Sequence, residues 1–159
     1  MSRRRRPVRG AAVPLLAALA LVAAACEKHE FEPPDRAQRV AEAEALLTPE
    51  TFDTITWPSD SARAFAGNDV YAARCRDCHG YLGTGDTDYA REHNVEPPSL
   101  VRPDFPYQDV VAMRRVIFTG HPEGMPTWGV AGITPREIDA AAFYILHLLR
   151  PEALGSAPP

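Results

Sequence analysis

The segment Cys75-Arg76-Asp77-Cys78-His79 constrains this chain more than any other feature. The chain has only three cysteines and five histidines in 159 residues, so the pattern would arise by chance in roughly 0.001 of shuffled sequences. C-x-x-C-H is the attachment signature of a c-type haem. Two thiols three residues apart can reach the two vinyl groups of one haem, and the next residue presents an imidazole to the iron. We therefore expect Cys75 and Cys78 to form thioethers and His79 to bind iron.

Two other uses of paired cysteines are weaker interpretations of this segment. A zinc site requires a second pair of ligands, and no such pair accompanies Cys75 and Cys78. A thioredoxin-like redox pair requires a βαβ pattern, and no run of residues alternates well enough to predict a strand. The haem interpretation has a further physical basis, because covalent attachment prevents loss of a haem outside the cell.

Length and charge restrict the classes of protein that this chain can be. Its 159 residues suit one domain with extensions, and 45% hydrophobic with 24% charged residues is ordinary globular composition. The 16 prolines predict long irregular connections. Beyond residue 25 the chain has 12 basic and 21 acidic residues, a net charge of −9. Such a chain is a poor partner for nucleic acid.

Residues 1–25 have the layout of an export signal. Five arginines at the start precede an apolar run of 15 residues, Ala11 to Ala25, which ends in three alanines suited to processing. A membrane-spanning helix needs about 20 apolar residues, so a permanent span is the less favoured alternative. We interpret residues 1–25 as a signal peptide.

The residues from Leu21 to Cys26 resemble the lipobox of bacterial lipoproteins. In that family the cysteine becomes the lipidated first residue, so the resemblance implies lipidation of Cys26. It also implies a chain anchored to the bacterial cell envelope, with its folded part in the periplasm. Ala23 departs from the pattern, in which leucine is commoner at this position. A secreted protein with an unmodified Cys26 remains the alternative.

Residues 26–60 are interpreted as a tether that carries a short helix. Good helix formers run from Asp35 to Leu47, and Asp35 is the expected N-cap. The apolar face of this helix is thin, consisting of Val40, Leu47 and a few alanines. Short helices depend on packing for stability, so we expect this helix to dock on the domain or on a partner.

A second iron ligand is expected from the Gly-Met-Pro stretch around Met125, 46 residues after His79. Glycine and proline let the backbone pass closely over a flat cofactor. With the haem motif, this stretch resembles the class I cytochrome c family, and the resemblance implies that Met125 is the sixth ligand. Met113 is the rival sulfur, but it falls in a predicted helix where packing is its better interpretation. Ligation by His121 remains an alternative.

The resemblance covers residues 61–150, the expected haem domain, in which three helices are predicted. They are expected at 62–76, 107–119 and 135–150. Gly120 should stop the second, whereas a capping box at Thr134 starts the third and Pro151 ends it. The buried stripe of the third helix is predicted to be Ile138, Ala141, Ala142, Ile145, Leu148 and Leu149. We expect an all-α class I cytochrome c fold with long loops around one haem, then a disordered tail at 151–159.

The first helix is expected to pack closely on the last. Ser61 is its expected cap, and Gly67 and Tyr71 share one face by their spacing. In class I cytochromes c the two helices cross with a glycine against an aromatic residue, so the resemblance implies that Gly67 meets Phe143 or Tyr144. An interior glycine costs about 1 kcal/mol against alanine, which a packing role would explain.

The resemblance implies three further contacts with the haem. The carbonyl of Pro98 would accept the second N–H of His79 and so orient the ring. Leu100 would pack on the haem face, and Trp128 would either donate to a haem propionate or cover the haem edge. An ordinary proline turn with a buried leucine is the alternative for Pro98 and Leu100.

These assignments imply a one-electron carrier with no catalysis of its own. Iron bound by both His79 and Met125 has no open position for a substrate, and methionine ligation raises the reduction potential. Partner docking is expected at the exposed haem edge near Cys75. The nearby candidate residues for docking are Arg74, Arg76, Arg114 and Arg115.

The resemblance implies redox partner proteins such as a quinol-oxidising complex or a terminal oxidase. The chain could shuttle freely or serve as a subunit, and its plan is similar to the mono-haem lipoprotein subunit of alternative complex III. A haem enzyme or gas sensor with a displaceable Met125 is the second hypothesis. A metal-binding assembly protein that uses Cys75 and Cys78 is the third.

Overall fold

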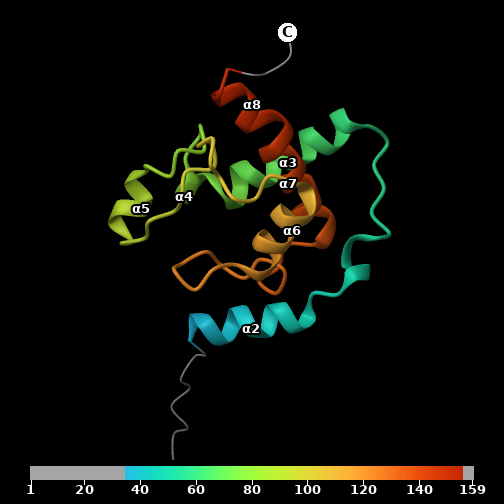
Figure 1. The fold of residues 1–159 in the computed structure, drawn as a ribbon, viewed down its shortest axis with the longest axis horizontal. Helices are drawn as coiled ribbons and strands as arrows, with labels where there is room; N and C mark the ends of the chain where they lie inside the picture. Colours follow the sequence, from blue (N-terminus) through green and yellow to red (C-terminus); the bar gives the residue numbers. More distant parts are fainter. Residues whose placement is uncertain (1–34, 156–159) are drawn as a thin grey trace, which may run out of the picture. The chain divides into compact units, whose positions relative to one another are not determined.

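The computed structural model describes residues 35–155 and shows an all-α protein (Figure 1). These residues contain no β-strand, which confirms the predicted fold class, and they belong to one compact unit that begins at Pro34. The predictions for residues 1–25 and for Cys26 concern positions outside the described residues. The elements are α2 (Arg36–Leu46), the 3₁₀ helix η1 (Pro49–Phe52), α3 (Asp60–Arg74), α4 (Arg76–His79), α5 (Asp88–Glu92), α6 (Val110–Thr119), α7 (Pro135–Tyr144), the π-helical turn η2 (Ile145–Leu149) and α8 (Arg150–Ala153). Within residues 35–155, no helix has the length and apolar character needed to cross a membrane.

Helix α3 packs against α7 in the most extensive helix–helix contact of the described residues (Figure 1). Gly67 lies at the contact: a Cβ atom there would be 2.1 Å from the carbonyl oxygen of Ala140 and 2.7 Å from the Cβ of Tyr144. The ring centroids of Tyr71 and Tyr144 are 5.6 Å apart. Gly67 therefore has the predicted packing role, and Tyr144 rather than Phe143 is the aromatic residue it meets.

Helices α3 and α6 begin at residues other than those predicted, because side-chain caps decide where each helix starts. The cap of α3 is Ser59, whose hydroxyl accepts a 3.1 Å hydrogen bond from the backbone N–H three residues later. The prediction of Ser61 as the cap is wrong. Asp109 caps α6 in the same way at 2.8 Å, so that helix starts at 110 rather than 107. Gly120 ends α6 as predicted, with φ at +71°.

The C-terminal helix continues through Pro151, so the predicted stop there is wrong. Its start is as expected, with Thr134 and Glu137 in a capping box. The π-turn η2 precedes α8, and this wide turn explains how the helix can continue past a proline. Proline lacks an N–H and its ring clashes with the carbonyl four residues earlier in a regular helix, a conflict that a π-bulge relieves. Leu148 is 39% exposed and does not join the buried stripe, and the predicted tail is helical at Pro151–Ala153.

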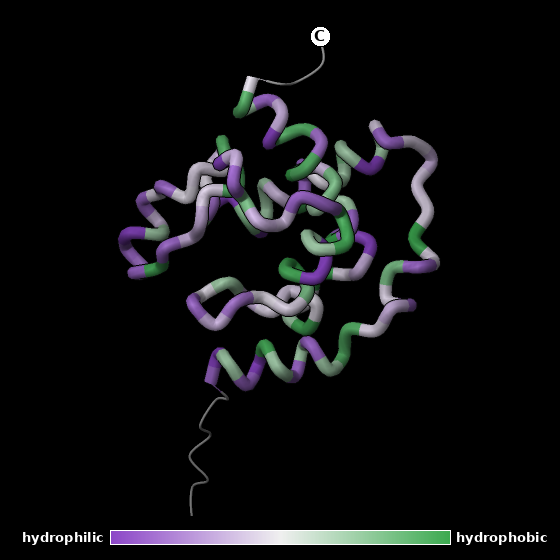
Figure 2. The backbone as a smooth tube through the Cα atoms, viewed as in Figure 1, coloured by the Kyte–Doolittle hydropathy of each residue, from purple (hydrophilic) through white to green (hydrophobic). Residues whose placement is uncertain are grey.

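The helix predicted in the tether is α2, and it packs on α6. Asp35 caps it as expected, accepting a 2.7 Å hydrogen bond from the N–H of Gln38. Figure 2 shows hydrophilic and hydrophobic residues alternating along this helix. On its inner face Ala43 has no exposed surface, and Leu47 packs against the core. The thin apolar face predicted from the sequence is therefore sufficient for docking on the domain.

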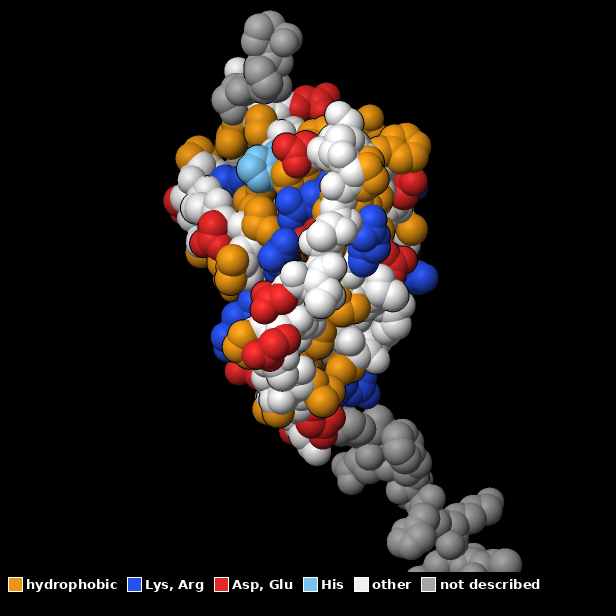
Figure 3. All heavy atoms as spheres, turned by 90° about the vertical axis from the view of Figure 1, so that its right-hand side faces the viewer, with side chains coloured by type: hydrophobic (Ala, Val, Ile, Leu, Met, Phe, Trp, Pro, Cys, Tyr) orange, Lys and Arg blue, Asp and Glu red, His pale blue; other side chains and the backbone are white. Residues whose placement is uncertain are grey.

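One buried carboxylate holds the segment between α2 and α3. Asp139 of α7 has no exposed surface, and it accepts hydrogen bonds from the indole of Trp57 at 2.6 Å and from Arg63 at 2.5 and 2.9 Å. Arg114 of α6 also bonds to it. Figure 3 shows the face over which this segment runs, where basic, acidic and apolar side chains are interspersed. Arg114 compensates this buried charge and is largely buried, so it is a weaker docking candidate than the exposed arginines.

Candidate functional site

The C-x-x-C-H motif forms one helical turn, α4, which follows directly from α3. Cys75 is both the C-cap of α3 and the N-cap of α4. Its carbonyl accepts a 2.9 Å hydrogen bond from the N–H of His79. Gly80 ends the turn with φ at +81°, a conformation that glycine adopts without strain. The turn therefore presents both thiols and the imidazole from one short, fixed segment.

Both thiols of the motif are free in this structure. Burial, together with the nearby Cys78, raises the pKa of Cys75 to about 12. Burial and the charge of Asp77 raise the pKa of Cys78. Neutral sulfur is therefore favoured at both positions, and a thioether, which carries no charge, suits such positions better than the thiolates that zinc requires.

The imidazole of His79 is neutral and largely buried. Burial lowers its pKa, and the backbone carbonyl of Pro98, which favours the protonated ring, offsets only part of this effect. Nδ1 is buried and forms no hydrogen bond of standard geometry with residues 35–155. The carbonyl of Pro98 is therefore near the ring without completing a hydrogen bond. A neutral imidazole is the form that binds a metal.

The loop that carries Pro98 and Leu100 is tied to the segment that follows the motif. The N–H of Leu100 donates to the carbonyl of Gly83 at 2.8 Å. Gly85, with φ at +81°, has no room for a side chain, because a Cβ there would be 2.3 Å from the carbonyl oxygen of Pro97. Leu100 is buried in the core. These close backbone contacts fix the loop beside His79.

A buried arginine that was not predicted from the sequence holds the same loop. Arg150 of α8 is 6% exposed, and its guanidinium donates to the carbonyl of Leu100, to the carbonyl of Arg102 at 3.4 Å and to the side-chain oxygen of Gln108 at 3.2 Å. Burial lowers its pKa. The guanidinium lies 5.1 Å from the ring centroid of Phe105. The sequence gives no signal for the burial of Arg150, because an arginine that precedes a proline at an expected helix end is normally exposed to solvent.

Met125 lies in the loop between α6 and α7. It is partly buried and packs, as Trp128 and Cys75 do, against the core cluster that contains Leu100. Met113 is 2% exposed within that core, as its packing interpretation predicts. The structure thus places Leu100 in the core cluster and Cys75, Met125 and Trp128 against it, with the carbonyl of Pro98 beside the ring of His79. Their individual roles toward a haem stay predictions.

The other histidines of the described residues face outward. His121 is exposed, and its Nδ1 is 3.7 Å from a carboxylate oxygen of Glu123. His93 is exposed and stacks on Tyr89. His147 is also exposed and packs against Phe143.

These residues fit a covalently attached haem. A neutral, largely buried imidazole, with the carbonyl of Pro98 beside its ring, lies next to two neutral thiols on the same turn. Cys75 and Cys78 would hold the porphyrin, and His79 would hold the iron from one side. The chemistry of this donor set suits a haem better than a bare metal ion, because only one of the three groups is in its metal-binding form.

Comparison with protein families agrees with this geometry. The family described as cytochrome C oxidase, cbb3-type, subunit III matches residues 62–145, more than half of the chain. No solved structure matches the chain. The matched region runs from α3 to the start of η2 and so includes the haem motif and Met125. The chain therefore belongs to the family of subunit III of cbb3-type cytochrome c oxidase and has a cytochrome c domain, which implies haem c and haem-based electron transfer.

Proposed function

We propose that this protein is a one-electron carrier anchored to the bacterial envelope, with a single covalent haem ligated by His79 and Met125. The observation that carries the proposal is the turn α4, where a neutral, buried His79 follows two neutral thiols. Haem at this turn supplies an iron centre that alternates between Fe(II) and Fe(III). The chain itself has to hold the two ligands still and exclude water.

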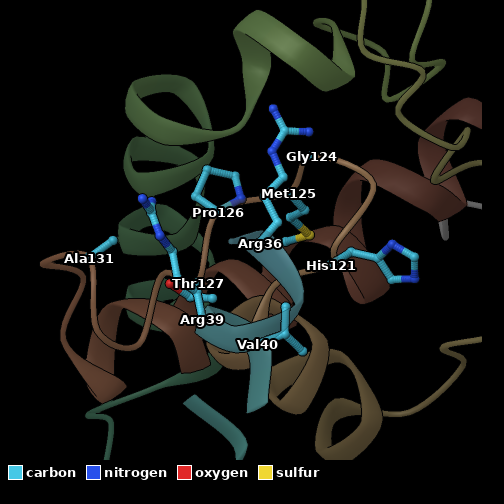
Figure 4. Close-up of a pocket in the computed structure, with 9 residues that line it drawn as sticks. All are labelled: Arg36, Arg39, Val40, His121, Gly124, Met125, Pro126, Thr127 and Ala131. Atoms are coloured by element: carbon cyan, nitrogen blue, oxygen red, sulfur yellow. The ribbon is translucent and has the colours of Figure 1, made fainter. Parts of the chain in front are cut away.

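Three features of the described residues support Met125 as the second ligand. Met125 is partly buried against the core cluster that Cys75 also contacts. Met113 is enclosed within α6 and the core, so it is not available without unfolding that helix. The ring of His121 points away from Met125 (Figure 4). Thioether ligation raises the potential relative to a second imidazole, which suits a carrier that receives electrons from quinol oxidation.

The proposed anchor and partners rest on the sequence and the family. The export signal at residues 1–25 and the lipobox-like Cys26 support lipid attachment with the haem domain in the periplasm. The cbb3-type oxidase family supports a place in a respiratory complex. A quinol-oxidising complex as donor and a terminal oxidase as acceptor are the partners that follow. Arg74 and Arg76, exposed beside the motif, remain the candidate docking arginines.

The intact mass of the membrane-purified protein tests the anchor and the haem together. The protein is produced in a host that matures c-type cytochromes and measured under denaturing conditions. We expect the mass of residues 26–159 plus one haem and a lipid moiety. A mass without haem overturns the carrier, and a mass with haem but no lipid overturns only the anchor.

The variant Met125→Ala tests the ligation. We expect loss of the sulfur-to-iron charge-transfer band, a lower reduction potential and rapid carbon monoxide binding by the reduced protein. Met113→Leu is the matched control, because this volume-conserving change removes the other sulfur and costs less than about 1.5 kcal/mol. An unchanged spectrum in Met125→Ala excludes Met125. Rapid, complete carbon monoxide binding by the unmodified protein would favour the gas-sensor alternative.

A further inference from the structure

Helix α2 lies over the part of the domain that carries Met125. Its buried residue Ala43 faces the domain, and Glu44 forms a 2.9 Å ion pair with Arg115 of α6. Figure 1 shows α2 alongside the loop that follows α6. The helix therefore contacts both α6 and the candidate ligand loop, although α2 precedes the matched family region in the sequence.

Helix α2 and the Met125 loop together line a partly open pocket of about 250 Å³. Arg36 and Val40 of α2 line this pocket together with Met125 of the loop (Figure 4). Gly124 marks the closest approach: a Cβ atom built there would lie 3.4 Å from Nη1 of Arg36 and 3.2 Å from Cγ1 of Val95. The residue before Met125 is thus held between α2 and the segment that follows α5.

The loop contributes little long-range hydrogen bonding of its own. The backbone hydrogen bonds of residues 121–125 given by the described structure are local, from the N–H of His121 to the carbonyl of Met125 at 3.0 Å and from the N–H of Gly124 to the carbonyl of His121 at 3.1 Å. A loop with only local hydrogen bonds opens at low free-energy cost unless another element covers it. Within residues 35–155, α2 is the helix that covers the outer side of this loop.

We infer that α2 is a strap that holds the Met125 loop closed: Val40, which lines the pocket together with Met125, is a positioning residue for the proposed ligand, and the buried Ala43 keeps the helix docked on the domain. The inference rests on the proposed ligation by Met125 and adds that the docking of α2 regulates this ligation. The thioether stays on the iron only while its loop is closed, and the fraction of closed loop depends on whether α2 is docked.

The test compares two identical substitutions on α2 in the full-length holoprotein. Ala43→Glu places a carboxylate at the buried position and should undock the helix. Ala41→Glu places it at an exposed position two residues earlier and is the matched control, with the same change in charge and helix propensity. Ala43→Ser is the milder variant that keeps the protein folded if Ala43→Glu does not.

The measurements are the sulfur-to-iron charge-transfer band, the reduction potential and the rate at which imidazole replaces Met125 in the ferric protein. In Ala43→Glu we expect a weaker band, a lower potential and imidazole binding faster by about tenfold or more, because the open loop becomes more populated. Ala43→Ser should show a smaller change in the same direction, and Ala41→Glu should match the unmodified protein.

Two outcomes overturn the strap. In one, Ala43→Glu lowers the melting temperature but leaves the band, the potential and the imidazole rate unchanged, which would make α2 merely structural. In the other, both Glu variants change these quantities equally, which would make the added charge the cause. Failure of the ligation itself is distinguishable, because the band would then be absent from the unmodified protein or unaffected by Met125→Ala.

Discussion

The two sides of the candidate haem site are held in different ways. On the His79 side, buried side chains of the core helices donate hydrogen bonds to the backbone of the loops. The hydroxyl of Tyr71 donates to the carbonyl of Gly80 at 2.6 Å, and the buried guanidinium of Arg150 donates to the carbonyl of Leu100. The turn after the motif and the loop after α5 are therefore both fixed to helices of the core.

On the Met125 side, hydrogen bonds stay within the loop or reach the adjacent helix. The N–H of Gly129 donates to the carbonyl of Phe118 at 3.0 Å, and the N–H of Ala131 donates to the carbonyl of Thr127 at 2.9 Å. Two partly open pockets of about 250 and 300 Å³ lie along the covering helix α2.

The difference matches the demands on the two proposed ligands. His79 follows two cysteines that would hold the haem covalently, so its side gains from a rigid frame. Met125 would be held by one coordinate bond and a loop with few long-range contacts. Local opening should therefore begin on the Met125 side, and the predictions below test this asymmetry.

The largest effect is expected from a substitution that weakens the frame common to both sides. Asp139→Ala leaves Arg63 and Arg114, whose side chains are 15% and 21% exposed, without their shared carboxylate. Removing one partner of a buried ion pair costs about 3–5 kcal/mol. Urea unfolding should show this loss, while the visible spectrum of the folded protein stays unchanged. Asp69→Ala, at an exposed position of α3, is the control and should stay within about 0.5 kcal/mol.

A selective effect on the His79 side is expected from Arg150→Met. The substitution removes charge-assisted hydrogen bonds to the loop, each worth about 1.5–3 kcal/mol, and relieves the burial of the charge, so the net loss should lie near the lower end. Hydrogen exchange at the amide of Leu100 should become faster, and exchange within the Met125 loop should not change. Arg102→Met is the matched control, because that side chain is 47% exposed. Unchanged protection of the Leu100 amide in Arg150→Met would contradict the proposed rigid frame.

Local signals in the sequence were sufficient for much of the fold. The capping box at Thr134 and the stop at Gly120 depend on neighbouring residues, and the C-x-x-C-H motif forms one turn for the same reason. Gly67 was recognised because a helical glycine needs an explanation and the family resemblance gave one. These features need no knowledge of distant contacts.

The missed features depend on partners far away in the sequence. Asp139 is bonded to residues 76 and 82 positions away, and Arg150 to a carbonyl 50 positions away. A charged residue in isolation is expected to face solvent, so such residues look ordinary until their partners are known. One signal was available: Asp139 shares a helix face with Ala142 and Phe143 by its spacing, and a lone acid on an apolar face predicts a buried partner.

A smaller effect on the His79 side is expected from Tyr71→Phe. The change deletes the hydrogen bond to the carbonyl of Gly80 and should cost about 1 kcal/mol. It should also change the pH dependence of stability, because burial, with Cys75 next in importance, raises the pKa of the Tyr71 hydroxyl. Because the pKa of Tyr71 is higher in the folded state, its neutral hydroxyl contributes its full stabilisation below the unfolded-state pKa of about 10. This stabilisation is lost progressively as the pH rises above about 10. Unfolding measured from pH 8 to 11 should show a steeper decline in the unmodified protein than in Tyr71→Phe, and equal slopes would contradict this role.

The smallest effect is expected from Glu44→Gln, which removes the ion pair between α2 and α6. The two side chains are 47% and 62% exposed, so the pair should contribute at most about 0.5 kcal/mol, and that contribution should vanish near 1 M salt, where the screening length is about 3 Å. The band and the imidazole rate should stay close to those of the unmodified protein at both low and high salt. A large change at low salt would mean that charge, rather than the burial of Ala43, holds α2 in place. Because surface ion pairs are worth little and buried contacts are worth more, the docking of α2 should depend on its single buried alanine and the neighbouring apolar residues, and the Met125 side should stay the softer side of the site.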